Sequence, residues 1–423
     1  MEKTYDSKRP WNYAFNESIT IRLLAYIIWP FGTWLYSLRK ANSKASFIIF
    51  FLFSLLICWH FSETSGLAYD DFIGIKQRFE QTNISTNQLL NQIEAYFSLK
   101  DDAPKELYEN VMIWLTKSIA NNYHLYFLLC AIPVAIFQLL TLRRVVMDYR
   151  FDRNSLYAIA IMIMIIFPRD IITVQNPRFA TALWLGVYVC ISSFTKKSNR
   201  LFHVIPILLC PLIHSGMWVF TIICVLFTFI PKPISFLEKV ALCTIPLGFF
   251  TTDFLIGFDF SQYLPSTLSN WAELYNNEES YAILHGEGRA GFWWVSWIFD
   301  TTMQIAYAWM AIKIIKGNRK YENEEGNNFY PFFLVLMILC NIMHSLPEIG
   351  KRYYWILQII IIFMWFKTQY PYDKKIMQLL MLGSFRGFLF RYGYLFGGAL
   401  AVTTPIDIYF LPLPYLMLKG LLF

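Results

Sequence analysis

Charged residues are scarce in this chain. They make up 15% of its 423 residues, whereas a soluble domain has roughly 25%. The composition therefore does not fit a soluble globular domain with a polar surface. The net charge of +7 is accordingly interpreted as a signal of membrane topology and not as an affinity for nucleic acid.

Several motifs are also missing. The sequence has no phosphate-binding loop, no His-Glu-x-x-His, no Cys-x-x-Cys pair and no nucleophile elbow, so nothing indicates ATP hydrolysis, a structural metal or another cofactor. The seven cysteines lie in apolar segments without metal-ligand spacing and are interpreted as small buried side chains. The run 286–291 fits GxGxxG, but no predicted strand precedes it, so we reject a dinucleotide site. The polar first twenty residues show no cleavable signal peptide, and no internal repeat is apparent.

Apolar residues dominate what is present. They form 56% of the chain, with a mean hydropathy of +0.41 and with 39 Phe, 26 Tyr and 14 Trp. A spanning helix needs about 20 mostly apolar residues. The sequence predicts an all-α polytopic membrane protein of about 11–12 transmembrane helices. The apolar cores lie at 23–38, 46–61, 125–140, 156–167, 179–194, 201–213, 217–230, 240–258, 291–315, 329–344 and 353–366, and a further region runs from 376 to the end.

Two ends of this single transmembrane domain, residues 1–423, allow more than one interpretation. The segment 23–38 contains Trp29-Pro30 and has basic residues on both sides. It either spans the membrane or lies as an in-plane or re-entrant helix. The tail from Ile376 contains Arg386 and Arg391, and it is compatible with one more span followed by an interfacial helix.

Basic residues orient the segments. The loops at 39–45, 141–153, 195–200, 231–239, 316–328 and 367–375 carry 18 lysines and arginines together, whereas those at 168–178, 214–216, 259–290 and 345–352 carry 5. By the positive-inside rule the first set is cytoplasmic and the second is outside. Two large loops then lie outside: 62–124, with two predicted amphipathic helices around Leu89–Phe97 and Leu107–Ile119, and 259–290, which resembles a lid.

Arginine prevails among the five basic residues of the predicted outer loops at 168–178, 214–216, 259–290 and 345–352. Four of these five residues are arginine, namely Arg169, Arg178, Arg289 and Arg352, whereas eleven of the eighteen cytoplasmic ones are lysine. A topological signal needs only charge, but a guanidinium also binds two phosphate oxygens at once. These arginines are therefore candidate phosphate ligands. The alternative is an arginine that reaches a lipid headgroup at the interface.

A few other polar residues are candidates for acid–base chemistry. His214 lies at the tight outer turn between the cores 201–213 and 217–230, where it can act as a general base or cap the hairpin. His344 is a second candidate. Glu348 and Asp71 lie near the outer face and can serve as acid or base. Asp300 lies inside the core 291–315 and is expected to form an ion pair, with Arg386 or Arg391 as partners.

The run from Asn176 to Phe220 resembles the bacterial O-antigen and capsular polysaccharide polymerases of the Wzy and EpsG type. The matching features are Arg178 leading into an Ala-rich span, a short basic turn at 196–200, Pro206 and Pro211, and the His214-Ser215 turn. Gly350-Lys351-Arg352-Tyr353-Tyr354 is similar to the second arginine–aromatic motif of that family. The family often has glutamine after its first arginine, where this chain has Phe179.

The resemblance implies a bundle of the GT-C class in the bacterial plasma (inner) membrane and no nucleotide sugar, metal or other cofactor. It implies a glycosyltransferase that moves a glycan from undecaprenyl pyrophosphate onto a lipid-linked repeat unit at the outer face. Arg178 and Arg352 would hold the pyrophosphate, Arg289 or Arg169 would assist, and His214 would be the base. The implied partners are the lipid-linked oligosaccharide, membrane lipids, a chain-length regulator and a flippase, but no nucleic acid.

Three other functions remain open at this stage. An O-antigen ligase uses the same donor and differs only in its acceptor. A flippase for lipid-linked oligosaccharide should carry charges deep in a central cavity and often has inverted repeats, neither of which is apparent here. A membrane O-acyltransferase would need its catalytic histidine in a different setting.

Overall fold

The part of the chain that the structure describes is built from helices, with one very short strand pair. The computed structural model describes residues 18–38, 43–63, 71–98, 100, 103–104, 106–147, 176–195, 201–229, 234–249, 293–317, 329–345, 347–368, 402–403 and 407–422. The strands β1 (Ser62–Glu63) and β2 (Val402–Thr403) pair antiparallel. The expected all-α class is thus confirmed.

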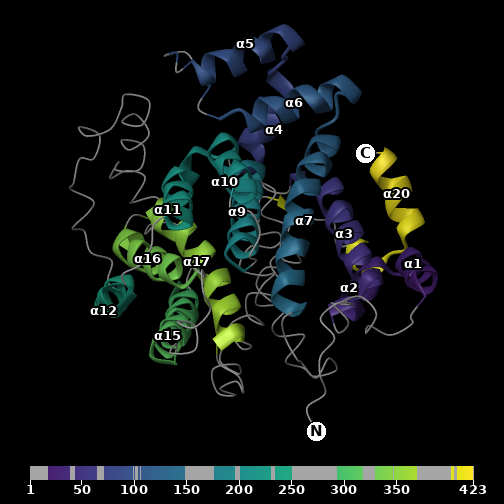
Figure 1. Ribbon diagram of the computed structural model, residues 1–423. Coiled ribbons are helices and arrows are strands. Elements are labelled where there is room, and N and C mark those ends of the chain that lie inside the picture. The colour runs from purple at the N-terminus through teal and green to yellow at the C-terminus, as the bar shows by residue number, and fades with distance from the viewer. Residues whose placement is uncertain are drawn as a thin grey trace. The chain divides into compact units, whose positions relative to one another are not determined.

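The chain divides into two compact units (Figure 1). The first comprises Met1–Thr86, Glu109–Tyr188 and Ser384–Phe423. Its helices are α1 (Ile19–Ile28), α2 (Pro30–Leu38), α3 (Lys44–Trp59), α4 (Asp71–Gln81), α6 (Tyr108–Ile119), α7 (Tyr123–Met147), α9 (Pro177–Thr195) up to Tyr188, α19 (Asp407–Phe410) and α20 (Leu413–Leu422).

The second unit comprises Asn87–Tyr108 and Val189–Gly383. Its elements are α5 (Thr86–Phe97), the end of α9, α10 (Leu201–Ile213), η3 (Ser215–Met217), α11 (Trp218–Phe229), α12 (Ile234–Thr244), η4 (Ile245–Gly248), α15 (Trp293–Gly317), α16 (Phe329–Ile342), η8 (Met343–Ser345) and α17 (Pro347–Thr368).

One helix of the described chain is both long and apolar enough to cross a membrane. It is the part Tyr123–Arg144 of α7, with 22 residues, or roughly 33 Å at 1.5 Å per residue. In the first unit α7 packs along α3 (Figure 1). Shorter apolar helices lie at Ile19–Ile28, Lys44–Trp59, Pro177–Ser192, Ser215–Phe227, Phe329–Ile342 and Arg352–Trp365.

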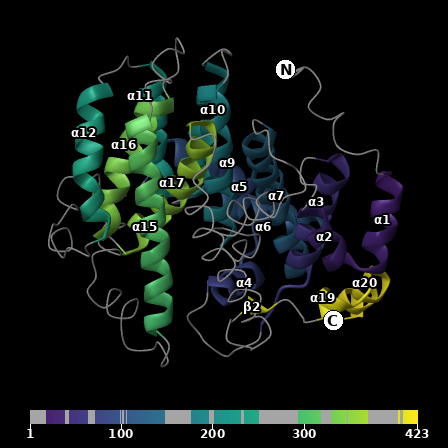
Figure 2. The same cartoon turned by 90° about the horizontal axis from the view of Figure 1, so that it is seen from below.

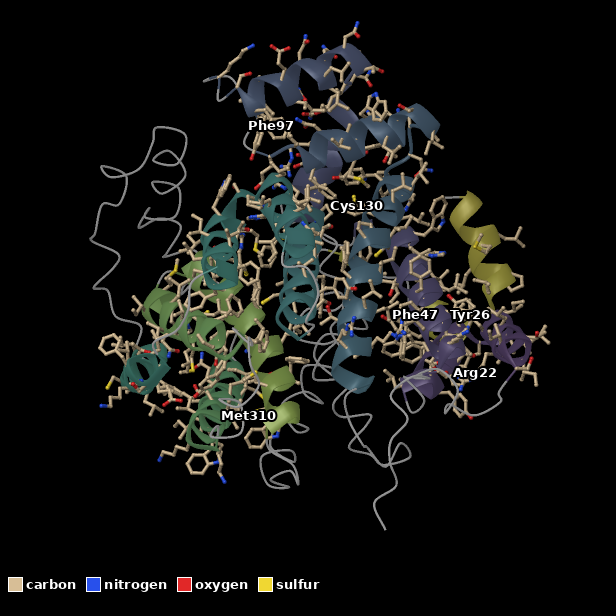
Figure 3. All side chains as sticks on the ribbon, viewed as in Figure 1. Arg22, Tyr26, Phe47, Phe97, Cys130 and Met310 are labelled. Carbon is tan, nitrogen blue, oxygen red and sulfur yellow. The ribbon has the colours of Figure 1, made fainter. Side chains whose placement is uncertain are left out.

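The segment 23–38 forms a helical hairpin and not a straight helix. Pro30 begins α2 directly after Trp29, where α1 has ended, because proline cannot donate the hydrogen bond that would continue the helix. The buried Arg22 on α1 (labelled in Figure 3) donates from Nη1 to Ser37 Oγ on α2, at 2.9 Å. Residues 22 and 37 would lie about 22 Å apart along one straight helix. A single straight helix is therefore wrong for this segment. Whether it spans the membrane or lies as an in-plane or re-entrant helix stays a prediction.

The tail docks on this part of the first unit. Trp29 Nε1 donates to the carbonyl oxygen of Tyr409 at 2.7 Å, and Phe31 lies edge-on to the ring of Tyr409. One His60 ring nitrogen, Nε2, lies 3.1 Å from the carbonyl oxygen of Leu416. Helix α20 lies beside α1 (Figure 2). These contacts place α19 and α20 against the hairpin.

The described residues of the stretch 62–124 form α4, α5 and α6 before α7 begins, whereas the sequence predicted two helices. Helices α5 and α6 run over the two stretches with apolar residues at helical spacing. Helix α4 has a weaker signal, because it has few apolar positions and Gly74 lowers its helix propensity. It forms nevertheless, since Ile75 and Phe79 are almost fully buried at one-turn spacing. Asp71, the first residue of α4, has a side chain outside the described part.

Helix α16 is the centre of the second unit. It packs against α11, α12 and α17 (Figures 1 and 2), and ten of its fourteen residues are buried. A helix that is apolar on all sides is expected in such a position. Helix α17 packs against α15 and α16 and is buried throughout Ile359–Trp365.

The prediction of an apolar helix core at 240–258 is wrong about where the helix begins. Helix α12 starts at Ile234, inside the predicted cytoplasmic loop, and ends at Thr244 before η4. It can include the charged Glu238 because the hydroxyl of Tyr330 on α16 donates to this carboxylate at 2.6 Å. Pro246 then ends the regular helix. Residues 250–258 lie outside the described part.

Candidate functional site

His214 lies at the turn between α10 and α11, in the second unit. Helix α10 contains Pro206 and Pro211 and ends at Ile213. His214 then adopts an extended backbone, and the N–H of Gly216 points at its Nδ1, 3.0 Å away. Its side chain is 7% exposed. The capping contact considered from the sequence is thus present, and it fixes one edge of the imidazole ring.

Arg352 contacts the other edge of the same ring. Its Nη1 lies 3.3 Å from His214 Nε2. Arg352 is in the second turn of α17, 138 residues further along the chain. The structure therefore brings together two of the residues selected from the sequence.

Glu106 is a third member of this site, which sequence reasoning missed. Its Oε1 accepts hydrogen bonds from the N–H and the hydroxyl of Ser215, at 2.9 and 3.0 Å. The same oxygen lies 3.8 Å from His214 Nδ1, and the Glu106 side chain is 8% exposed. Glu106 comes from the segment between α5 and α6, 109 residues before Ser215. No local pattern in the sequence connects the two.

The hydroxyl of Tyr353 binds the backbone of the turn that follows His214. Its hydroxyl donates to the carbonyl oxygen of Gly216 at 2.5 Å and accepts from the N–H of Phe220 at 3.4 Å. Because successive residues of a helix point about 100° apart, Arg352 and Tyr353 reach different parts of the turn. The arginine–aromatic sequence of α17 thus holds both the ring of His214 and the backbone beside it.

The next residue of α17 lies against a second histidine. The rings of Tyr354 and His344 have centroids 5.7 Å apart, and His344 Nε2 lies 3.4 Å from Gln304 Nε2 on α15. Gly350 permits this arrangement, since a Cβ atom there would lie 2.0 Å from the carbonyl oxygen of Met343. His344 is therefore held by packing on α17, separately from the contacts of His214.

Arg178 lies in the first unit. It is the second residue of α9, and Asn176 precedes the helix, where its carbonyl oxygen accepts from the N–H of Ala180. Arg178 Nε is 3.3 Å from Glu109 Oε2, while Arg78 Nε is 2.7 Å from Glu109 Oε1. The Glu109 side chain is 10% exposed. Two guanidinium groups therefore share one carboxylate, and the three charges sum to +1.

The remaining residues proposed from the sequence have no described side chain. Arg169 and Arg289 lie outside the described residues, together with the loop 259–290, Arg386 and Arg391. Glu348 is in α17 and Asp300 in α15, but their side chains are not described. Within the described part of the chain, no group of three or more His, Cys, Asp or Glu side chains is arranged to hold a metal ion.

The described site combines a cation, an imidazole and a carboxylate at one turn. Arg352 can bind an anion, because a guanidinium carries five N–H donors in a planar fork. His214 can exchange a proton at a ring nitrogen. Glu106 supplies a nearby negative charge at the opposite edge of the ring. A set of this kind suits the transfer of a proton next to a group that leaves as an anion.

Comparisons with known proteins give no further constraint on this site. No protein-family model, no curated protein and no solved structure matches the chain.

Proposed function

We propose that the protein is a polytopic membrane glycosyltransferase of the polysaccharide polymerase type, with a GT-C-like bundle. It transfers a glycan from undecaprenyl pyrophosphate to a lipid-linked repeat unit at the outer face of the plasma membrane. The observation that carries the proposal is the contact of Arg352 with His214, with Glu106 beside the same ring. The sequence resemblance supplies the particular substrate.

Exposed apolar side chains support the membrane part of the proposal. On α10 the residues Ile205, Leu208 and Leu209 are 63%, 46% and 45% exposed, and on α11 Ile222 and Leu226 are 51% and 46% exposed. Their spacing of three or four residues places them on one side of each helix. Such a surface is unfavourable in water and is expected where a helix meets lipid. His214, between these two helices, is buried.

The proposed reaction needs no ATP, because the pyrophosphate is the leaving group. An acceptor hydroxyl oxygen attacks the anomeric carbon of the donor glycan and forms the new C–O bond. The bond from that carbon to the pyrophosphate oxygen breaks, and its electron pair stays on the pyrophosphate. His214 accepts the hydroxyl proton at Nε2, and Arg352 stabilises the charge that develops on the leaving group.

This scheme gives Arg352 two successive partners. In the structure, its Nη1 lies 3.3 Å from His214 Nε2. A pyrophosphate draws the guanidinium toward its oxygens, because a charge-assisted hydrogen bond is stronger than one to a neutral imidazole. Nε2 then presents its lone pair to the acceptor. Arg178 has a proposed role of the same kind in the first unit, where a phosphate would compete with Glu109 for its guanidinium.

Deletion of the gene tests the function most simply. We expect the ladder of surface polysaccharide on a gel to disappear while a single repeat unit remains. Loss of every repeat would point to a ligase or a flippase and would contradict the proposal. Complementation with Arg352→Ala should leave the single repeat, whereas the wild-type gene at equal protein level should restore the ladder.

A further inference from the structure

The segment between α5 and α6 is fixed to the turn on both sides of His214. Before the histidine, the N–H of Leu107 donates to the carbonyl oxygen of Leu212 at 3.1 Å. After it, Glu106 Oε1 accepts from both the N–H and the hydroxyl of Ser215. Two adjacent residues of this segment thus fix the backbone around the imidazole, which places the carboxylate of Glu106 with little freedom to move.

The two nitrogens of the His214 ring face two hydrogen-bond donors. The N–H of Gly216 points at Nδ1, at 3.0 Å, and Arg352 Nη1 lies 3.3 Å from Nε2. A guanidinium can only donate. A neutral imidazole has one nitrogen that accepts and one that carries the proton. Only one of the two contacts can therefore be a hydrogen bond at a time, and something else must decide which nitrogen holds the proton.

Among the described groups, Glu106 can determine which nitrogen of the His214 ring carries the proton. Its carboxylate oxygen is 3.8 Å from Nδ1. A negative charge at that edge stabilises a proton on Nδ1, as a carboxylate does when it orients a catalytic histidine. The proton on Nδ1 leaves the lone pair on Nε2, where Arg352 can donate to it. Without the charge, Gly216 would hold the lone pair on Nδ1, and the proton on Nε2 would face Arg352.

We propose that Glu106 is a positioning residue for His214, which keeps the ring proton on Nδ1 and so presents the Nε2 lone pair to Arg352 and to the acceptor hydroxyl. The second half of this statement rests on the proposed function. The first half concerns the protein alone and holds for any chemistry at Nε2. Glu106 acts through His214, so its loss should change both the protonation of the ring and the reaction rate.

Few charged or titratable groups of the described chain lie near the His214 ring and could determine where its proton sits. In the described part, Glu106 faces His214 from the segment before α6, and Arg352 faces it from α17. Tyr353 reaches the neighbouring Gly216. Burial first, and the charge of Glu106 second, raise the pKa of Tyr96 on α5. Glu106 supplies the one carboxyl group among these described contacts of the ring.

The variant Glu106→Gln separates charge from hydrogen bonding. The amide oxygen of glutamine can still accept from Ser215, so the turn should remain folded, but the negative charge is lost. Glu106→Ala removes both. Glu94→Gln is the matched control, since Glu94 lies on α5 and its side chain is 69% exposed beside Lys100. It removes the same charge without touching the turn.

The test is nitrogen-15 NMR of histidine in the full-length protein in lipid bilayers. His214→Asn identifies the resonances by difference. We expect a protonated Nδ1 and an unprotonated Nε2 in the wild type and in Glu94→Gln, and the opposite tautomer in Glu106→Gln. The same tautomer in the wild type and in Glu106→Gln would overturn the proposal. This result does not depend on whether the protein polymerises glycans.

The pH dependence of polymerisation gives the second measurement. An opposite charge within roughly 4–6 Å favours the charged form of an ionisable group. Glu106→Gln should therefore lower the plateau rate about tenfold or more and move the acid limb to lower pH. A rate that falls with an unmoved acid limb and an unchanged tautomer would assign Glu106 a merely structural role. If the wild-type protein transfers no glycan while the tautomer reverses, the proposed function fails and the positioning role stands.

Discussion

Tyr353→Phe is the substitution whose effect on the site can be worked out most fully. Residues 216 and 220 are related as i and i+4, the spacing of a helical hydrogen bond, and the Tyr353 hydroxyl contacts the carbonyl oxygen of the first and the N–H of the second. Tyr353 is 3% exposed. Phenylalanine keeps the ring and its packing but removes both contacts with the beginning of α11.

The magnitude follows from the two backbone groups that lose a partner. A buried polar group without a partner costs about 1–3 kcal/mol, and side-chain hydrogen bonds in membrane helices average about 0.6 kcal/mol. Gly216 and Phe220 can move toward each other and recover part of the loss. We therefore expect a loss of about 1–2 kcal/mol in stability. Because the N–H of Gly216 lies against His214 Nδ1, a shift of this residue moves the ring, and we also expect the reaction rate to fall about tenfold, which corresponds to about 1.4 kcal/mol.

A thiol-reactive fluorescent dye measures the stability during heating. Six of the seven cysteines are buried, so the dye reports unfolding in detergent or in lipid. Tyr354→Phe is the control, because the described ring contacts of Tyr354 are with His344 and Tyr307 and not with the His214 turn. Equal transition temperatures and equal rates for the two variants would refute the role given to the Tyr353 hydroxyl.

Two further substitutions test the packing around the site and the hairpin. Gly350→Ala places a Cβ atom against the carbonyl oxygen of Met343, and since backbone must move, we expect a loss of about 3 kcal/mol or more; a variant that unfolds at the wild-type temperature would contradict this close approach. Trp29→Phe keeps the aromatic ring but removes the hydrogen bond to Tyr409. It should cost about 1 kcal/mol and make the tail cleave faster in limited proteolysis than in the wild type, and an unchanged cleavage rate would speak against this anchor.

The pairing of His214 with Arg352 shows how much of the site can be predicted from the sequence. Charge counting predicts that both residues lie on the outer side of a membrane, and the preference for arginine among the basic residues there singles out Arg352. Neither argument gives a distance. The contact of 3.3 Å depends on how α17 packs in the second unit, and that packing involves apolar faces with no specific pattern.

Glu106 could not be predicted in the same way. It lies in a loop with nine acidic residues, and nothing in its neighbourhood distinguishes it. Its partner Ser215 is 109 residues away. The hairpin of α1 and α2 is an intermediate case, since Trp29-Pro30 predicts a break, but only the contact of Arg22 with Ser37 shows that the chain turns back.

The most direct test of the central claim is glycan transfer by the purified protein in liposomes. The substrate is a lipid-linked repeat unit, and the two products, longer glycan and free undecaprenyl pyrophosphate, are measured together. We predict that the wild type releases one pyrophosphate lipid for each unit added, that Arg352→Lys retains part of the rate, and that Arg352→Ala and His214→Ala lose at least about 100-fold. Transfer at the wild-type rate by both alanine variants would contradict the site.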